Sequence, residues 1–367
     1  MYEDLYEVEP NRNAEAYRNY VPQYFPAQVE KYIEFIEFSE DGYMLLGSSN
    51  MTGRYWVGSV WYFTDPEAAP DVDKCLTGST TETGVCDGQF LPDKQKVLVA
   101  EDSGTLQLLG LSEVPDEQSI YFSTIESKCE HDDTVLSLSV FPGEMRAVSG
   151  SADMNIKVWN VENLKCVQTY RPAHTHQVTC VSTCPERSNV FASCSLDGTL
   201  CTWDTRSDST SKPATVVLRE NCSFGCVAWQ PSTSDILAVG SNCGTVRLMD
   251  IRCTKEPLWQ FTHFERPMYR IRFADHRPNW MAICADESKL EVVDCSTLEV
   301  VYTDDRHEDF VRGLAWNPKT EHLHSCGWDK QVLVHSPVVN MDVNGSTPDC
   351  KKDISSTDVI ESERATV

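Results

Sequence analysis

The sequence lacks an excess of basic residues. Its 367 residues carry 31 lysines and arginines against 56 aspartates and glutamates, which gives a formal net charge of −25 at pH 7. Proteins that bind nucleic acid or an anionic membrane surface need basic patches that displace counterions. The composition therefore argues against direct binding of nucleic acid or of a membrane surface, and it favours a basic protein as partner.

Long apolar runs and a secretory signal are also missing. No apolar stretch approaches the ~20 residues that a membrane-spanning helix needs, although 41% of the residues are hydrophobic, which is enough for a large core. The first ten residues, MYEDLYEVEP, have neither a basic head nor an apolar stretch, so we expect no signal peptide and a reducing compartment. Lys351 and Lys352 alone are weak evidence for a nuclear import signal.

The sixteen cysteines show no metal-ligand spacing. There is no Cys-x2-Cys pair to indicate zinc, and disulfides are disfavoured in a reducing compartment. The nearest pairs are Cys180 with Cys184 and Cys222 with Cys226. Residues four apart in a strand lie about 13 Å apart, too far to share one metal. We expect no metal, no cofactor, and mostly small buried hydrophobic cysteines.

The sequence does contain a repeated pattern of short strands, which is clearest in residues 131–160. Residues 135–141 alternate apolar and polar side chains, and two further runs follow at 146–151 and 156–159, each after a turn. Positions in register with Trp159 recur at intervals of 42 to 50 residues, at Phe63, Leu109, Trp203, Met249, Val293 and His335. Four-stranded units at this spacing indicate an all-β propeller with seven blades.

Spaced polar residues add a family resemblance. His131, Ser149, Asp153 and Trp159 stand where WD-repeat proteins place a hydrogen-bonded chain that ties the loop before a blade to its third strand. The corresponding residues are His174, Ser193, Asp197 and Trp203 in the fourth repeat and His307, Ser325 and Asp329 in the seventh. His335 replaces the tryptophan in the seventh repeat, so the chain there must end differently. Blades one and two have lost most of these polar residues, and we expect apolar packing in their place.

A serine, a histidine and an aspartate also suggest a hydrolytic triad. A triad requires an exposed nucleophile and an oxyanion hole, but Ser149 lies in an apolar run and His131 opens a strand. Buried polar groups need hydrogen-bond partners, and a chain that ends on the Trp159 indole supplies them. We therefore interpret these residues as structural and expect that the chain is not an enzyme.

The two ends of the chain differ in composition from the repeats. Residues 1–26 form an acidic, tyrosine-rich, flexible arm, residues 27–343 hold the propeller, and residues 344–367 form a tail that we expect to be disordered. Because an unpaired edge strand promotes aggregation, blade seven needs a fourth strand, from residues 21–28 or 338–343. We prefer the N-terminal segment, since WD-repeat proteins usually close in this way.

Two segments interrupt the repeat and are candidates for binding. Residues 49–57 (SNMTGRYWV) replace a turn of about four residues, so Arg54, Tyr55 and Trp56 are expected on a long loop. These residue types dominate interface hot spots; the alternative is that Trp56 covers blade one. Residues 64–83, rich in proline and acidic side chains, are expected to replace or precede an outer strand.

A more specific resemblance covers about residues 26–335. Residues 45–70, 170–174 (YRPAH) and 306–312 (RHEDFVR) are similar to the methylosome WD-repeat proteins, partners of the symmetric-dimethylating (type II) protein arginine methyltransferase. In that family, a Gly-Arg-x-Trp insertion of the first blade reaches into the N-terminal barrel domain of the enzyme. The matching residues here are Gly53, Arg54 and Trp56, with Tyr55 between them.

Other loops share the rim of the propeller with this insertion. They add Arg171 and Phe310 as partner-binding candidates; Phe310, at the start of a strand, is either half-exposed or a core residue. The rim also carries acidic residues that fit Arg-rich substrate tails or simply form a solvated face. They are Asp132, Asp133, Glu308 and Asp309.

The resemblance implies a non-catalytic adaptor, in cytoplasm and nucleus, that binds and stabilises the methyltransferase in a hetero-oligomer. It would help to present histone tails and spliceosomal Sm proteins, while the partner uses S-adenosylmethionine, because no nucleotide-binding glycine-rich loop is present here. A rival interpretation uses residues 203–206 (WDTR) and 249–252 (MDIR), which resemble the Asp-x-Arg element of substrate receptors of cullin–RING ubiquitin ligases. Such an Asp and Arg also pair locally.

Overall fold

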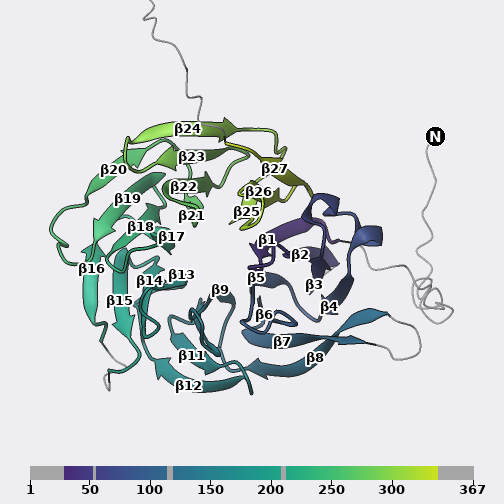
Figure 1. The fold of residues 1–367 in the computed structure, drawn as a ribbon. Coiled ribbons are helices and arrows are strands. Elements are labelled where there is room, and N and C mark those ends of the chain that lie inside the picture. The colour runs from purple at the N-terminus through teal and green to yellow at the C-terminus, as the bar shows by residue number, and fades with distance from the viewer. Residues whose placement is uncertain (1–28, 53–54, 114–118, 208–211, 338–367) are drawn as a thin grey trace, which may run out of the picture. The chain divides into compact units, whose positions relative to one another are not determined.

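Seven antiparallel sheets surround a common axis in the computed structural model, which describes residues 29–52, 55–113, 119–207 and 212–337 (Figure 1). Within these residues, six sheets have four strands and one has three. The predicted all-β, seven-bladed WD-repeat propeller is therefore confirmed. Both predicted end segments, 1–26 and 344–367, lie outside the described residues.

The strands follow one another from the axis outward in each blade. Blade one contains β1 (Tyr32–Phe38), β2 (Met44–Thr52), β3 (Tyr55–Phe63) and β4 (Thr77–Thr81), and blade two contains β5 (Val85–Phe90), β6 (Lys96–Glu101), β7 (Thr105–Glu113) and β8 (Ile120–Cys129). Blade three contains β9 (Val135–Val140), β10 (Arg146–Ser151), β11 (Ile156–Asn160) and β12 (Lys165–Tyr170), and blade four contains β13 (Val178–Thr183), β14 (Val190–Ser195), β15 (Thr199–Asp204) and β16 (Thr215–Arg219). Blade five contains β17 (Phe224–Trp229), β18 (Ile236–Ser241), β19 (Thr245–Asp250) and β20 (Trp259–Thr262), and blade six contains β21 (Met268–Ala274), β22 (Arg277–Ala285), β23 (Leu290–Asp294) and β24 (Glu299–Asp304). Blade seven contains β25 (Val311–Trp316), β26 (Leu323–Gly327) and β27 (Val332–His335).

Strand register is the same in the blades that were aligned by sequence. Trp159 pairs with Ala147 across β10 and β11, and His335 pairs with Leu323 across β26 and β27. The innermost strands contact one another in order around the axis, and β25 contacts β1. All seven run in one direction, so one end of the ring collects their first residues and the other end their last.

The core is divided among the gaps between neighbouring blades. Between blades three and four, the fully buried Trp203 packs with Phe141 and Phe191. Between blades seven and one, Ile33 and Ile36 pack with Cys326. Apolar burial stabilises a fold by roughly 25 cal/mol per Å2. This last cluster therefore stabilises the contact between blade one and blade seven, where the ring closes. Both proposed closing strands, 21–28 and 338–343, lie outside the described residues.

The segment 64–83 contains the outer strand β4 and the connection that leads into it. It forms two short 3-10 turns, η1 (Pro66–Ala68) and η2 (Val72–Lys74), and then enters β4. Asp65 and Asp71 accept hydrogen bonds from the backbone of these turns, at 3.2 Å each, which gives these two acidic residues a structural role. Among the described residues, no helix is long and apolar enough to cross a bilayer.

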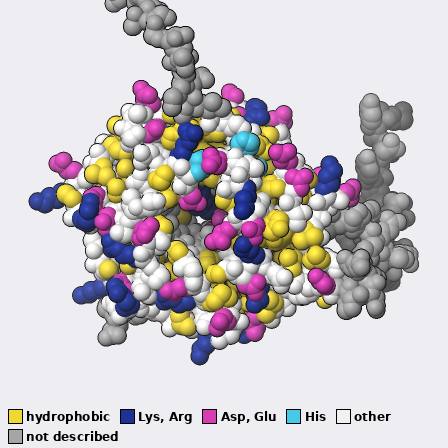
Figure 2. Space-filling view, viewed as in Figure 1, with side chains coloured by type: hydrophobic (Ala, Val, Ile, Leu, Met, Phe, Trp, Pro, Cys, Tyr) yellow, Lys and Arg dark blue, Asp and Glu magenta, His cyan; other side chains and the backbone are white. Residues whose placement is uncertain are grey.

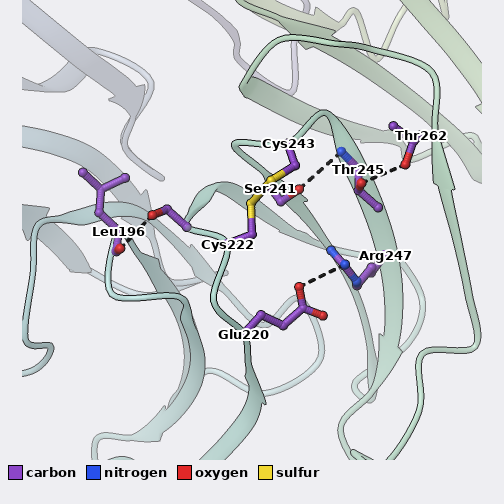
Figure 3. Close-up of a disulfide and its surroundings, with 9 residues drawn as sticks. Leu196, Glu220, Cys222, Ser241, Cys243, Thr245, Arg247 and Thr262 are labelled. Carbon is purple, nitrogen blue, oxygen red and sulfur yellow. Dashed lines mark hydrogen bonds and ion pairs between the residues drawn. A yellow bond between two sulfur atoms is a disulfide. The ribbon is translucent and has the colours of Figure 1, made fainter.

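The cysteines depart from expectation at one place. Cys222 and Cys243 form a disulfide (S–S 2.28 Å, Cα–Cα 6.8 Å), as Figure 3 shows. Cys222 precedes β17, and Cys243 lies in the turn between β18 and β19, so the strands bring together residues 21 positions apart. The expectation that disulfides are disfavoured is wrong for this pair, as is the placement of Cys222 in a strand. Eight other cysteines are buried: Cys180, Cys184, Cys194, Cys201, Cys226, Cys284, Cys295 and Cys326.

Candidate functional site

The insertion in blade one is a β-hairpin and not the long loop that the sequence suggested. Strands β2 and β3 continue past the rest of the sheet, with Met51 paired to Trp56 and Thr52 to Tyr55. The β-branched Thr52 and Val57 and the aromatic Tyr55 and Trp56 favour this extension, because such residues suit a pleated strand. The hairpin tip, with Gly53 and Arg54, lies outside the described residues.

The hairpin presents large apolar side chains to solvent. The exposed fraction is 53% for Met51, 76% for Tyr55 and 38% for Trp56. Because Met51 and Trp56 are directly paired across the strands, they lie on the same face of the hairpin, and Tyr55 lies on the opposite face. Met51 and Trp56 thus form an exposed apolar pair on one face of the hairpin, and exposed apolar groups that lie together are typical of interaction surfaces.

Trp56 belongs to a row of aromatic rings that crosses from blade one to blade seven. Its ring centroid is 5.8 Å from that of Tyr32, which is 5.1 Å from Trp328, which in turn is 5.5 Å from Phe310. We call Trp56, Tyr32, Trp328 and Phe310 the aromatic row. It connects two residues that the sequence singled out, and Phe310 is half-buried within it.

Tyr32 and Trp328 were missed by the sequence analysis. Trp328 occupies the turn position between second and third strands where the other repeats carry Ala152 and Leu196. The unusual tryptophan at this position could have marked Trp328 as a candidate. Nothing in the sequence marked Tyr32, because its proximity to blade seven depends on closure of the ring.

Arg312 packs against two rings of the aromatic row, Trp328 and Phe310. Its guanidinium carbon lies 4.2 Å from the ring centroid of Tyr269, 4.3 Å from Trp328 and 5.1 Å from Phe310. Its Nη1 forms an ion pair of 2.6 Å with Asp286. A planar cation stacked on aromatic faces and held by a carboxylate fixes the orientation of those rings.

The polar residues of blade three form a closed chain of hydrogen bonds. Trp159 Nε1 donates to Ser149 Oγ (2.8 Å), Ser149 bonds His131 Nε2 (2.8 Å), and His131 Nδ1 bonds Asp153 (2.9 Å). Burial raises the pKa of Asp153, but the bonds from His131 and the backbone outweigh it and hold the pKa below its usual value. Ser149 is fully buried with both hydrogen-bond partners filled, so it is not an accessible nucleophile.

The other two polar chains have the same plan. In blade four, Ser193 accepts from Trp203 (2.8 Å) and bonds His174 (2.7 Å), which bonds Asp197 (3.2 Å). In blade seven, the members are His307, Ser325 and Asp329, with distances of 2.7 and 2.8 Å. The chain in blade seven ends on His335, whose Nε2 is 2.7 Å from Ser325 Oγ.

Arg171 lies on another part of the rim, between blades three and four. Its side chain is 71% exposed and lies 3.6 Å from Asp132. Both residues line an open depression of 470 Å3, together with Asp133 and Met154. In Figure 2, acidic and basic side chains are mixed around the central opening of the ring.

The two Asp-x-Arg elements are paired within themselves. Arg206 Nη2 lies 2.6 Å from Asp204, and Arg252 Nη2 lies 2.7 Å from Asp250. Local pairing of each aspartate with the arginine two residues later accounts for both motifs. Nothing in these contacts favours the ubiquitin-ligase interpretation.

Comparison with known proteins adds a family signal. The model of the WD domain, G-beta repeat, matches residues 123–160, 164–204 and 298–336. Each match begins in or near the outer strand of one blade and ends with the third strand of the next, so sequence repeat and blade are offset.

Two full-length relatives cover most of the ring. The chain is 35% identical over 315 residues to the methylosome protein WDR77 of Xenopus laevis, covering 84% of this chain and 91% of that protein. It is 27% identical to Protein valois of Drosophila melanogaster, covering 82% and 84%. A shorter match, 27% identical over 44% of this chain and 39% of the relative, is to the histone acetyltransferase type B subunit 2 of Candida glabrata.

Proposed function

The chain belongs to the family of methylosome WD-repeat proteins, and we propose that it is a non-catalytic adaptor that binds and stabilises a type II protein arginine methyltransferase. The blade-one hairpin makes the central contact, with Trp56 as its anchor. Tyr55, Phe310 and the hairpin tip at Gly53 and Arg54 contribute to the same contact.

The exposed Trp56 in the aromatic row carries this proposal. Buried aromatic anchors surrounded by weaker contacts supply most of the free energy at protein interfaces. Tyr32 packs against Trp56, and Trp328 packs against Tyr32, so the anchor is already held before a partner arrives. Preorganised side chains lose less conformational entropy on binding, which favours this surface over scattered exposed residues elsewhere.

We further propose that the adaptor helps to present basic, Arg-rich substrates such as histone tails and Sm proteins. The net charge of −25 and the acidic depression beside Arg171 support this role, because opposite charge accelerates association. Cytoplasmic and nuclear localisation remains part of the proposal, and fractionation of the cells of origin tests it.

Titration of the purified methyltransferase with Trp56→Ala tests the docking. Loss of a buried anchor is expected to weaken binding by roughly 2–4 kcal/mol, measured by calorimetry. Leu258→Ala is the matched control, because Leu258 is equally apolar and 53% exposed but lies in blade five. If a folded Trp56→Ala variant bound the methyltransferase with wild-type affinity, Trp56 would not be the anchor of the interface.

A further inference from the structure

A cavity of 310 Å3 lies at the end of the ring where the innermost strands end. Blades one, four, five, six and seven contribute the residues that line it. The blade-one hairpin lies at the other end of the ring, because β2 runs antiparallel to β1 and reaches the hairpin beside the start of β1. The contact proposed for Trp56 therefore leaves this cavity accessible.

The cavity exists because small and long side chains occupy one register position of the innermost strands. This position directly precedes the last regular pair of each innermost strand with its neighbour. Blades four, five and seven place Ser182, Ala228 and Ala315 there. Blades one and six place Glu37 and Arg272 there. The two charged side chains thus line a space that the three small residues leave open.

The turns around the cavity differ between blades at a second register position, two residues after the last regular pair. Glu40 and Asp275 occupy it in blades one and six, and both are exposed. The other five blades have a proline there: Pro92, Pro142, Pro185, Pro231 and Pro318. Neither carboxylate has an ion-pair partner within the part of the chain that the structure describes. An apolar rim thus carries two carboxylates that are available to a ligand.

The charges of the cavity favour a cation. Its lining contains three carboxylates, those of Glu37, Glu40 and Asp275, and one guanidinium, that of Arg272. Arg272 Nη2 lies 3.9 Å from Glu37 Oε2, which is too long for a hydrogen bond. Burial raises the pKa of Glu37 to about 7, and Arg272 lowers it only in part. A bound cation would offset the desolvation of Glu37 and lie near the two carboxylates of the rim.

Two tryptophans form walls that are held from neighbouring blades. Trp229 Nε1 donates to the carbonyl oxygen of Ser182 at 3.0 Å, and Trp316 Nε1 donates to that of Arg272 at 3.2 Å. Both tryptophans line the cavity. Aromatic walls suit the apolar stem of a long basic side chain, and a guanidinium enters such a site more readily than an ammonium because it is more weakly hydrated. The cavity therefore fits an arginine side chain.

A second cavity of 310 Å3 adjoins the first and has a different character. The two share Phe38 and Glu40 as lining residues. The apolar side chains that line the second cavity come from blades two and three: Phe90, Leu91, Val140 and Phe141. Its one basic residue, Lys94, is paired with Asp41 at 2.5 Å. We call the two cavities together the distal groove, which offers an acidic site and an apolar site side by side.

We propose that the distal groove binds a basic segment of a partner protein, with an arginine side chain in the first cavity and an apolar side chain in the second. The assignment gives the proposed presentation of Arg-rich substrates a specific site, and it rests on that proposal for the identity of the partner. It does not depend on the methyltransferase contact of Trp56. Because the two sites lie at opposite ends of the ring, both partners can be bound at once.

The test is a calorimetric titration of the full chain with capped peptides in which one to four glycines separate an arginine from a leucine. These spacings cover about 7 to 17 Å of extended chain. At the fitting spacing, saturable binding is expected to shift the indole N–H resonances of Trp229 and Trp316 in 15N spectra and to leave those of Trp56 and Trp328 in place.

Changes on both sides of the contact test the two cavities separately. Citrulline in place of arginine should weaken binding roughly tenfold, and Glu37→Gln should do the same, because each removes one charge of the contact. Asp275→Asn should act in the same direction. Glycine in place of leucine should weaken binding roughly fivefold, because the second cavity then stays empty. Equal affinity of the citrulline peptide, or of the glycine peptide, would overturn the proposal.

Glu34→Gln is the matched control. Glu34 lies on the same strand β1, and burial likewise raises its pKa to about 7, but it lines a pocket at the hairpin end of the ring. This variant should leave peptide binding unchanged, and thermal melting confirms that each variant is folded.

The site and the proposed function fail in different ways. Peptide binding that shifts only residues near Asp132 and Arg171 overturns the distal groove and leaves the presentation of basic substrates standing. Absence of binding by every peptide of the series overturns the distal groove, whereas the methyltransferase contact is measured separately with Trp56→Ala.

Discussion

The Nε2 atom of His335 donates a hydrogen bond to Ser325 Oγ, 2.7 Å away, in the buried core of blade seven. In blade three, the indole of Trp159 makes the equivalent bond to Ser149. Arg306 donates to the other ring nitrogen of His335 at 3.1 Å, which places the imidazole proton on Nε2. A neutral histidine therefore replaces the tryptophan donor, and burial lowers its pKa to about 4.

This histidine makes stability depend on pH. Between pH 6.5 and about 4, the unfolded chain binds a proton that folded His335 does not, so stability falls as the pH is lowered through this window, by up to roughly 3 kcal/mol. His335→Gln should flatten the difference between urea unfolding at pH 7 and at pH 4.5. His322→Gln, at a half-buried position, is the control and should leave this difference between the two pH values in place. His324, whose pKa burial also lowers to about 4, is unchanged in both variants. An identical pH profile for His335→Gln would contradict the assignment.

The period and register of the blades were predictable because they are local. Each strand alternates apolar and polar side chains, and the polar residues of blade three keep fixed spacings within about 30 positions of sequence. The third-strand positions, from Phe63 to His335, follow from this alone. The family resemblance added the hairpin residues, which the period could only mark as an irregularity.

Features that depend on closure of the ring were not predictable. Tyr32 and Trp328 meet only because blade one packs against blade seven, across nearly the whole sequence. The hairpin was taken for a loop because sequence length does not show whether two strands remain paired beyond the sheet. Cys222 and Cys243 escaped notice because their approach is set by turns on neighbouring strands and not by their spacing.

Ser149→Ala should destabilise the fold strongly and reveal no lost activity. The change leaves the Trp159 indole N–H and His131 Nε2 without partners in a buried site, and each unsatisfied group costs roughly 1–3 kcal/mol. Urea unfolding should therefore show a loss of about 2–5 kcal/mol. Ser127→Ala, on the exposed strand β8, should change stability by less than about 0.5 kcal/mol. A hydrolytic activity that disappears while the variant stays folded would instead restore the triad.

The Cys222–Cys243 disulfide should stabilise blade five only under oxidising conditions. The two cysteines are 21 positions apart, and closing a loop of that length stabilises a protein by roughly 3 kcal/mol through the unfolded state. Cys222→Ser should lower the free energy of unfolding by about that amount in oxidising buffer and by little in dithiothreitol. Cys253→Ser, an exposed free cysteine, controls for loss of a thiol. Equal unfolding of wild type and Cys222→Ser without reductant would show that the bond does not form.

Arg312→Lys tests whether aromatic stacking holds the aromatic row in place. Lysine keeps the positive charge and its attraction to Asp286, but it loses the flat contact with Tyr269 and Trp328. We expect a loss of about 1–2 kcal/mol in urea unfolding and a shifted tryptophan emission. Arg247→Lys is the matched control, because Arg247 is similarly buried and paired with Glu220 at 2.9 Å but has no ring contact within the described residues. A larger loss for Arg312→Lys isolates the stacking, since both variants keep a cation beside its carboxylate. Equal losses would mean that the ion pair alone positions Arg312, and that the row owes its order to ring-to-ring packing.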